Sequence, residues 1–171
     1  MSEPVISKSV IGGAVEESPG YARRFQDLRV YKKGRVLAKE VFLATKQCFP
    51  PEEKFSLTDQ IRRASRSVGA QLAEAWAKRR YPAHFISKLS DADGEQQETQ
   101  HWLTVDCGYF SAEETRRLGG LCLEVGRMLG EMTAKSDQFC QTDSNGLLRE
   151  PPGDYFVHED SGFLVAPITE D

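Results

Sequence analysis

Three side chains in one short stretch could bind a metal ion: Glu95, Glu98 and His101. The Glu-x-x-His spacing places a carboxylate and an imidazole on one face of a helix, as in the iron sites of ferritin-like bundles. Such a site needs two of these motifs and two further glutamates, but this chain has one motif, and His84 and His158 stand elsewhere. We therefore predict no metal site, and interpret Glu95 and Glu98 as acceptors for buried or intersubunit donors.

Motifs for nucleophilic catalysis and for phosphate binding are absent from the sequence. No Gly-x-Ser-x-Gly nucleophile elbow occurs. Neither of the glycine-rich patterns that cradle nucleotide phosphates, GxxxxGK[ST] and GxGxxG, is present. The sequence therefore predicts no catalytic residue, no cofactor and no enzymatic activity.

A basic segment between residues 56 and 82 has a net charge of +4. Its cationic residues are candidate nucleic-acid ligands: Arg62, Arg63, Arg66, Lys78, Arg79 and Arg80. At about 100° per residue, arginines and small residues share one helical strip, formed by Arg62, Arg66, Gly69, Ala73 and Arg80. This strip suits close approach of another backbone, with guanidinium groups bridging to carboxylates or phosphates.

The next segment, residues 83–107, has the opposite net charge of −4. Oppositely charged faces on adjacent helices can pair within one subunit or between subunits. For pairing between subunits, we predict an oligomer interface that contains Gly69, Ala73, Glu74, Glu95 and Glu98. The alternative is that both faces are solvated and joined by intramolecular ion pairs.

Apolar residues at three- and four-residue steps predict four long helices. They are expected over residues 28–49, 56–81, 83–107 and 111–140, with capping boxes at Ser56–Asp59 and Ser111–Glu114. The connection around Gly108 is too short for anything but an antiparallel hairpin. The predicted fold is all-α: an antiparallel up-down-up-down four-helix bundle with flexible N- and C-terminal tails.

The length of 171 residues suits one domain with a single core. We divide the chain into an N-terminal extension at 1–24, the four-helix bundle at 25–141 and an acidic C-terminal tail at 142–171. Residues 141–171 carry a net charge of −6, yet they contain apolar clusters that could dock on a protein partner. The predicted docking residues are Tyr155, Phe156, Phe163 and Leu164. An unstructured tail is the alternative.

Two further features bear on cellular location. No apolar run reaches the roughly 18 residues that a membrane span requires, and the N-terminus does not resemble a signal peptide. The cysteines, Cys48, Cys107, Cys122 and Cys140, have no CxxC spacing and are interpreted as buried, reduced side chains. We expect a cytoplasmic protein that has no membrane partner.

Several sequence blocks resemble those of a known family. They are Phe25–Tyr31, Cys48–Glu52, Leu57–Val68, Ala73–Glu74, Gly94–Leu103 and Cys107–Tyr109. They are similar to the four helix bundle proteins, also called 23S rRNA intervening-sequence proteins, over roughly residues 25–135. The resemblance implies a bundle that assembles into a homopentameric ring and has no established enzymatic activity.

The resemblance also implies a second possible function. A relative in this family, the accessory variability protein of diversity-generating retroelements, partners a reverse transcriptase and binds nucleic acid through a basic surface. This chain differs in being acidic overall, and in reading Ser67–Ala75 where the family usually has Ser-Ile-x-x-Asn-Ile-Ala-Glu-Gly. Two functions therefore stay open: a homo-oligomeric scaffold or adaptor that binds a protein partner, and an accessory protein that binds RNA or DNA.

Overall fold

The computed structural model describes residues 22–105, 107–140, 142 and 147. Over these residues the chain forms α-helices and two short 3-10 helices, with no β-strand. The α-helices are α1 (Arg29–Cys48), α2 (Leu57–Ala77), α3 (Pro82–Leu103), α4 (Ala112–Ala134) and α5 (Ser136–Cys140). The 3-10 helices are Phe25–Asp27 and Pro51–Phe55. The expectation of an all-α fold is confirmed.

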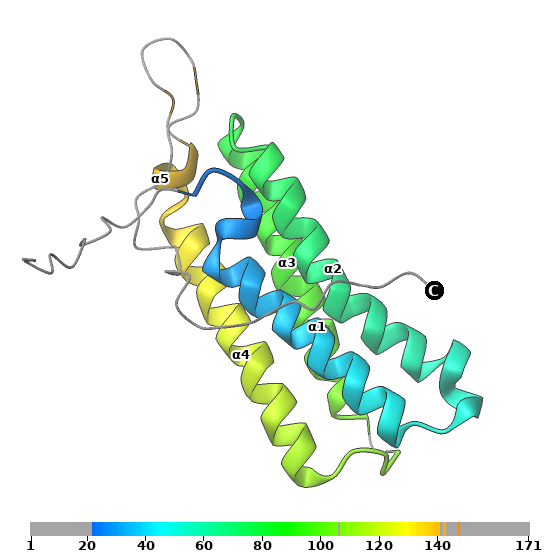
Figure 1. The fold of residues 1–171 in the computed structure, drawn as a ribbon. Coiled ribbons are helices and arrows are strands. Elements are labelled where there is room, and N and C mark those ends of the chain that lie inside the picture. Colours follow the sequence, from blue (N-terminus) through cyan, green and yellow to red (C-terminus); the bar gives the residue numbers. More distant parts are fainter. Residues whose placement is uncertain (1–21, 106, 141, 143–146, 148–171) are drawn as a thin grey trace, which may run out of the picture.

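The four long helices lie side by side around one core (Figure 1). Helix α1 packs against α2, α2 against α3, α3 against α4, and α4 returns to contact α1. Each helix contributes a fully buried apolar side chain to the shared core: Leu37, Ile61, Leu89 and Val125. The short helix α5 packs on α3. The described chain is thus a helical bundle.

The predicted core positions agree with the structure best on α2. Six apolar residues at three- and four-residue steps along α2 are all buried: Leu57, Ile61, Ala64, Val68, Leu72 and Ala75. On α1 and α3 the same spacing of apolar residues includes two that are exposed, Phe42 and Ile86. In contrast, Gln96 of α3 is fully buried, although a polar residue gives no sequence signal for the core.

The capping hydrogen bonds of the first two long helices differ from those that the sequence suggests. Asp27 precedes the first predicted helix and is of a type that often caps helices, but it does not cap α1. Its carboxylate accepts hydrogen bonds from the Arg23 and Arg24 N–H groups in the preceding 3-10 turn. At α2, the Ser56 side chain makes no capping hydrogen bond. Glu53 takes that role, because its carboxylate accepts from both the Ser56 hydroxyl and the Leu57 N–H.

The two ends of α3 also differ from the prediction. Pro82 was expected to end the second helix, but α2 ends at Ala77 and Pro82 is the first residue of α3. A proline fits there because the first turn of a helix needs no N–H donor. Helix α3 then ends at Leu103, before the predicted Cys107, with the Thr104 N–H bonded to the His101 carbonyl.

Helix α4 begins as predicted and ends early. The Ser111 hydroxyl accepts a hydrogen bond from the Glu114 N–H and so caps the helix. At the other end the helix is interrupted at Lys135, and α5 starts as a separate turn. The interruption lets Phe139 stack against Phe85, with ring centroids 5.8 Å apart and both rings fully buried.

Parts of the sequence-based prediction lie outside the described residues. They include most of the N-terminal extension and the predicted docking residues Tyr155, Phe156, Phe163 and Leu164. Among the described helices, none is long and apolar enough to cross a membrane.

Candidate interaction surfaces

The six basic residues predicted to bind nucleic acid fall into two groups, one on α2 and one directly after it. Arg62, Arg63 and Arg66 lie in its first half, whereas Lys78, Arg79 and Arg80 follow its last turn. Lys78 lies twelve positions after Arg66, which corresponds to about 18 Å along a helix axis. The six residues therefore do not form one continuous patch on a single chain.

Arg62 links α2 to α1. Its Nε donates a hydrogen bond to Thr45 Oγ1 at 2.7 Å, and its guanidinium group lies 4.7 Å from the Phe42 ring centroid. Burial lowers the pKa of the Arg62 guanidinium, and neighbouring Arg66 lowers it further. Arg62 is thus engaged within the bundle, while Arg63 and Arg66 are exposed.

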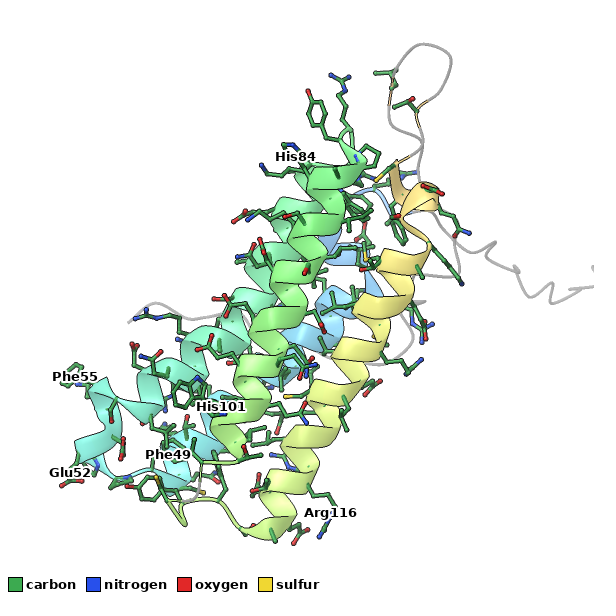
Figure 2. The ribbon with its side chains drawn as sticks, turned by 180° about the vertical axis from the view of Figure 1, so that it is seen from behind. Phe49, Glu52, Phe55, His84, His101 and Arg116 are labelled. Carbon is green, nitrogen blue, oxygen red and sulfur yellow. The ribbon has the colours of Figure 1, made fainter. Side chains whose placement is uncertain are left out.

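The second basic group lies at the turn between α2 and α3. Arg79 stacks over the Trp76 ring at 3.4 Å and donates from Nε to the Trp76 carbonyl at 3.0 Å. Arg80 and Tyr81 are exposed, and the Tyr81 ring lies 5.7 Å from that of His84. His84 is at the end of the bundle opposite Phe49 (Figure 2). This turn is therefore both basic and aromatic.

Tyr81 was not among the predicted site residues. Its position directly before Pro82 is typical of a helix boundary or a turn, and the residue is 59% exposed. Because the second helix is predicted to extend to residue 81, the sequence pattern places Tyr81 in a helix and not in an exposed turn.

The small-residue strip on α2 faces a neighbouring helix of the same chain. A Cβ atom at Gly69 would lie 3.5 Å from Cε2 of Tyr31 on α1, and Ala73 is half-buried. Glu74 is exposed and forms an ion pair with Lys88 at 2.9 Å. The hydrogen bonds that Lys88 Nζ donates to Glu74 and to Asp91 raise the pKa of Lys88. The ion pair between Glu74 and Lys88 joins an acidic residue of α2 to a basic residue of α3, which is the reverse of the net charges of the two segments.

Glu95 and Glu98 differ in their surroundings. Glu98 Oε1 accepts a hydrogen bond from Trp102 Nε1 at 3.0 Å. Glu95 is half-buried, and no hydrogen bond or ion pair to its carboxylate occurs within the described part of the chain. Burial raises the pKa of Glu95, and the charges of Glu98 and Asp91 raise it further. Over the same described residues, no group of three or more His, Cys, Asp or Glu side chains could hold a metal ion.

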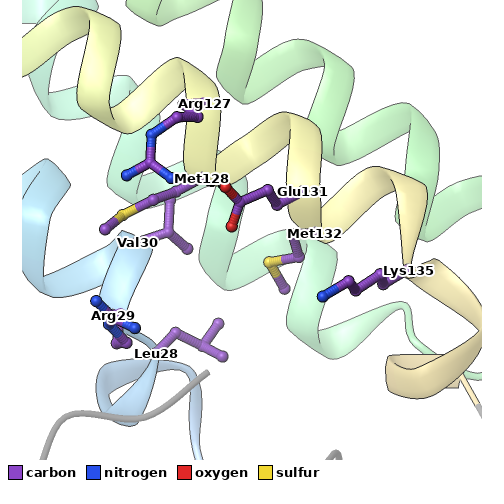
Figure 3. Close-up of a pocket in the computed structure, with 8 residues that line it drawn as sticks. All are labelled: Leu28, Arg29, Val30, Arg127, Met128, Glu131, Met132 and Lys135. Carbon is purple, nitrogen blue, oxygen red and sulfur yellow. Dashed lines mark hydrogen bonds and ion pairs between the residues drawn. The ribbon is translucent and has the colours of Figure 1, made fainter. Parts of the chain in front are cut away.

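A pocket of about 130 Å³ lies between the start of α1 and the last turns of α4 (Figure 3). It is lined by Leu28, Arg29, Val30, Arg127, Met128, Glu131, Met132 and Lys135. Arg127 and Glu131 form an ion pair at 2.6 Å. No local sequence pattern indicates this pocket, because its two sides are about 100 residues apart in the chain.

The four cysteines are free and differ in exposure. Cys122 and Cys140 are buried, Cys48 is half-buried and Cys107 is exposed. The expectation of burial is therefore wrong for Cys107, which follows the end of α3 instead of lying inside it. Burial raises the pKa of the Cys122 thiol to about 12, although a hydrogen bond with Gln96 acts in the opposite direction.

Comparisons with known proteins agree with this architecture. A solved structure of a protein of unknown function from the S23 ribosomal protein family of Bacteroides thetaiotaomicron is 26% identical, with a TM-score of 0.55. The match covers 61% of this chain and 97% of that one. A comparison with curated proteins gives no match. The family profile described as 23S rRNA-intervening sequence protein matches residues 26–131. This chain therefore belongs to the 23S rRNA-intervening sequence protein family.

Proposed function

We propose that the protein is a non-enzymatic homo-oligomer, a pentameric ring, that acts as a scaffold or adaptor for a protein partner in the cytoplasm. The observation that carries the proposal is the Glu95 carboxylate on α3. It is half-buried and has no cation paired with it within the described residues. The free cysteines are in keeping with a reducing compartment.

A partly desolvated carboxylate is costly unless a donor or a cation compensates it. The exposed guanidinium groups of Arg63 and Arg66 on α2 are suitable donors from a second copy of the chain. Contact between the α2 surface of one copy and the α3 surface of the next is heterologous, and such contacts close into rings when the rotation permits. This arrangement would use the charge difference between α2 and α3.

Size-exclusion chromatography with light scattering tests the proposal. The expected mass is near five times the 19.2 kDa of the chain, and raising the salt concentration should favour smaller species. The double variant Glu95→Lys, Glu98→Lys should dissociate the ring. Glu52→Lys with Glu113→Lys, two exposed positions, is the matched control. A monomer mass for the unmodified protein at micromolar concentration would refute the proposal.

We also infer that the four long helices form an antiparallel, up-down-up-down bundle. Two ion pairs between α1 and α4 support it, because Lys33 pairs with Glu124 whereas Arg117 pairs with Glu40. From the first pair to the second, residue numbers rise in α1 and fall in α4. This order supports an antiparallel arrangement of the two helices. The short connections between successive helices are in keeping with this topology.

Nucleic-acid binding is the second candidate, and the turn between α2 and α3 favours it. Lys78 and Arg80 there could neutralise phosphates, while the exposed Tyr81 ring offers a stacking surface for an unpaired base. In a gel-shift assay, single-stranded RNA should bind with an affinity that falls steeply with salt. Lys78→Ala with Arg80→Ala should weaken binding more than Lys46→Ala with Lys54→Ala, two exposed lysines elsewhere. An absence of any shift at low salt would exclude this function.

A further inference from the structure

Helix α1 carries a strong positive charge. It contains six cationic residues and one acidic residue, a net charge of +5. The helix packs between α2 and α4, so its remaining side faces outward. Its acidic residue, Glu40, pairs with Arg117 of α4 at 2.7 Å, and Lys33 pairs with Glu124 of α4 at 3.0 Å. These two pairs leave the outward side of α1 without an acidic residue of its own.

The outward side of α1 is both cationic and apolar. At about 100° per residue, six of its side chains fall within roughly 100° of the helix circumference. They form what we call the cationic face of α1: Lys32, Arg35, Val36, Lys39, Leu43 and Lys46. Val36 is 37% exposed and Leu43 is 39% exposed, and they lie about 10 Å apart along the helix axis. Apolar side chains therefore line one edge of the face, and basic side chains occupy the rest of it.

Two of the basic side chains can pair with a partner. Arg35 and Lys46 are exposed, and neither forms a hydrogen bond or an ion pair within the described part of the chain. They lie about 16 Å apart along the helix axis, which is roughly three helical turns. A partner that pairs with both cations therefore carries carboxylates or phosphates spaced over a similar length.

The apolar edge distinguishes between kinds of partner. Nucleic acids bind basic surfaces through their phosphates and stack their bases on aromatic rings, but Val36 and Leu43 offer no ring. A helix that binds a lipid surface inserts its apolar side chains about 5–10 Å into the bilayer, but the bundle covers more than half of each of these two residues. An amphipathic helix of another protein uses both the apolar edge and the cations. The face thus favours a helix with one apolar side and acidic residues beside it.

We propose that the cationic face of α1 binds an acidic amphipathic helix of the protein partner. The partner helix lies along α1. Its apolar side chains contact Val36 and Leu43, and its carboxylates pair with Arg35 and Lys46. The inference rests on the adaptor function proposed above, for which it names the chemistry of the partner. The face shares no residue with the α2 and α3 surfaces proposed to join the copies of the chain.

Fluorescence anisotropy with the full chain tests the docking surface. The probe is a fluorescein-labelled peptide of about 18 residues, long enough to form a helix, built from Glu, Ala and Leu with Leu at three- and four-residue steps. This peptide should bind at micromolar concentration. A peptide with Lys in place of every Glu, and one with Ser in place of every Leu, should bind at least about tenfold more weakly. Equal binding of the three peptides, or no binding of the acidic one at about 100 μM, would overturn the proposal.

Two matched pairs of variants locate the binding site. Arg35→Glu with Lys46→Glu should weaken binding of the acidic peptide about tenfold, because two ion pairs become repulsive. Lys54→Glu with Arg116→Glu makes the same change in net charge at two exposed positions off the face, and should weaken it less than about twofold.

The second pair tests the apolar edge. Leu43→Ser should weaken binding about threefold or more, whereas Leu123→Ser, at an exposed leucine of α4, should not. Equal effects within either pair would overturn the proposal, with circular dichroism confirming that the variants are folded.

Light scattering on the same variants separates the docking surface from the subunit interface. The mass of Arg35→Glu with Lys46→Glu should equal that of the unmodified protein. A smaller mass would place the face between copies of the chain, which would overturn the docking surface but not the oligomer. Specific peptide binding by a protein that is monomeric would refute the ring alone. Single-stranded RNA, or vesicles containing phosphatidylserine, that bound this face more tightly than the acidic peptide would assign it to that ligand instead.

Discussion

A Cβ atom on Gly126 of α4 would lie only 2.8 Å from Oε1 of Gln96 on α3. Gln96 is fully buried, its Nε2 donates to Gln100 Oε1 at 3.3 Å, and its Oε1 has no hydrogen-bond partner among the described residues. The glycine therefore makes room for a polar side chain in the core between these two helices. This contact leads to the first prediction.

Gly126→Ala should be at least about 1 kcal/mol less stable than Gly130→Ala, as measured by urea unfolding. Alanine favours a helix over glycine by about 1 kcal/mol at either site. At Gly130 nothing lies within 4 Å of the added Cβ, so alanine should stabilise the helix there. At Gly126 the Gln96 amide must move, and overpacking in a core offsets the gain.

The same pair allows a double-mutant cycle. In a Gln96→Ala background the amide is absent, so Gly126→Ala should become as favourable as Gly130→Ala. If the two glycine substitutions have equal effects with Gln96 in place, the close contact has no energetic consequence.

Arg62 should contribute to stability, and Arg63 should not. Arg62→Ala removes the hydrogen bond to Thr45 and the contact with the Phe42 ring, for an expected loss of about 1–2 kcal/mol. Arg63→Ala removes only an exposed ion pair with Asp59, for which about 0.5 kcal/mol or less is expected. Thermal unfolding of the two variants gives the comparison, and equal losses would contradict the assigned role of Arg62.

The pH dependence of stability should reflect Glu53. Its carboxylate accepts hydrogen bonds from Ser56, from the Leu57 N–H and from Tyr109, which hold its pKa below the usual 4.5. Because the folded-state pKa is the lower one, ionised Glu53 stabilises the fold fully above pH 4.5. The stabilisation is lost as the pH falls through the lowered pKa.

Glu53→Gln should therefore reduce the free energy of unfolding near about pH 7 more than near about pH 3. Glu52→Gln, at the adjacent exposed position, should change it little at either pH. Urea unfolding at both pH values provides the measurement. If Glu53→Gln lowered the free energy of unfolding equally at both pH values, the ionised carboxylate would not be the stabilising form.

The cysteines should differ in their reactivity in the folded protein. Thiolates are the reactive species, and burial raises the pKa of Cys122 to about 12. Cys107 is exposed and should react first with a thiol-specific reagent. Cys107→Ser should abolish the fast phase, Cys122→Ser should leave it intact, and urea should expose the remaining thiols. A fast phase that survives Cys107→Ser would contradict the exposure pattern.

Much of the fold could be predicted from the sequence because helical periodicity is a local property. The stripe from Leu57 to Ala75 and the cap at Ser111 depend on residues a few positions apart, and both agree with the structure. The capping side chain of α2 is not the predicted one, because two groups, Ser56 and Glu53, could each accept from the free N–H donors at that end. Only the backbone conformation at Ser56 decides between them.

The functional surfaces were harder to predict, because they depend on contacts between distant residues. Sequence patterns placed Arg62 and Gly69 on one strip of a helix, and that placement follows from helix geometry. The contacts of this strip depend on how α1 packs against α2. In the structure the strip lies against Phe42 and Tyr31 of the same chain.

The sequence by itself determined the helical class, the family and the charges carried by each helix, since these follow from residue type and local spacing. The tertiary structure decided which charges are paired, that Glu95 lacks a partner among the described residues, and that Leu28 and Met132 meet across a pocket. Burial and pairing are relations between segments far apart in the chain. They arise only when the helices pack, and local sequence patterns do not encode them.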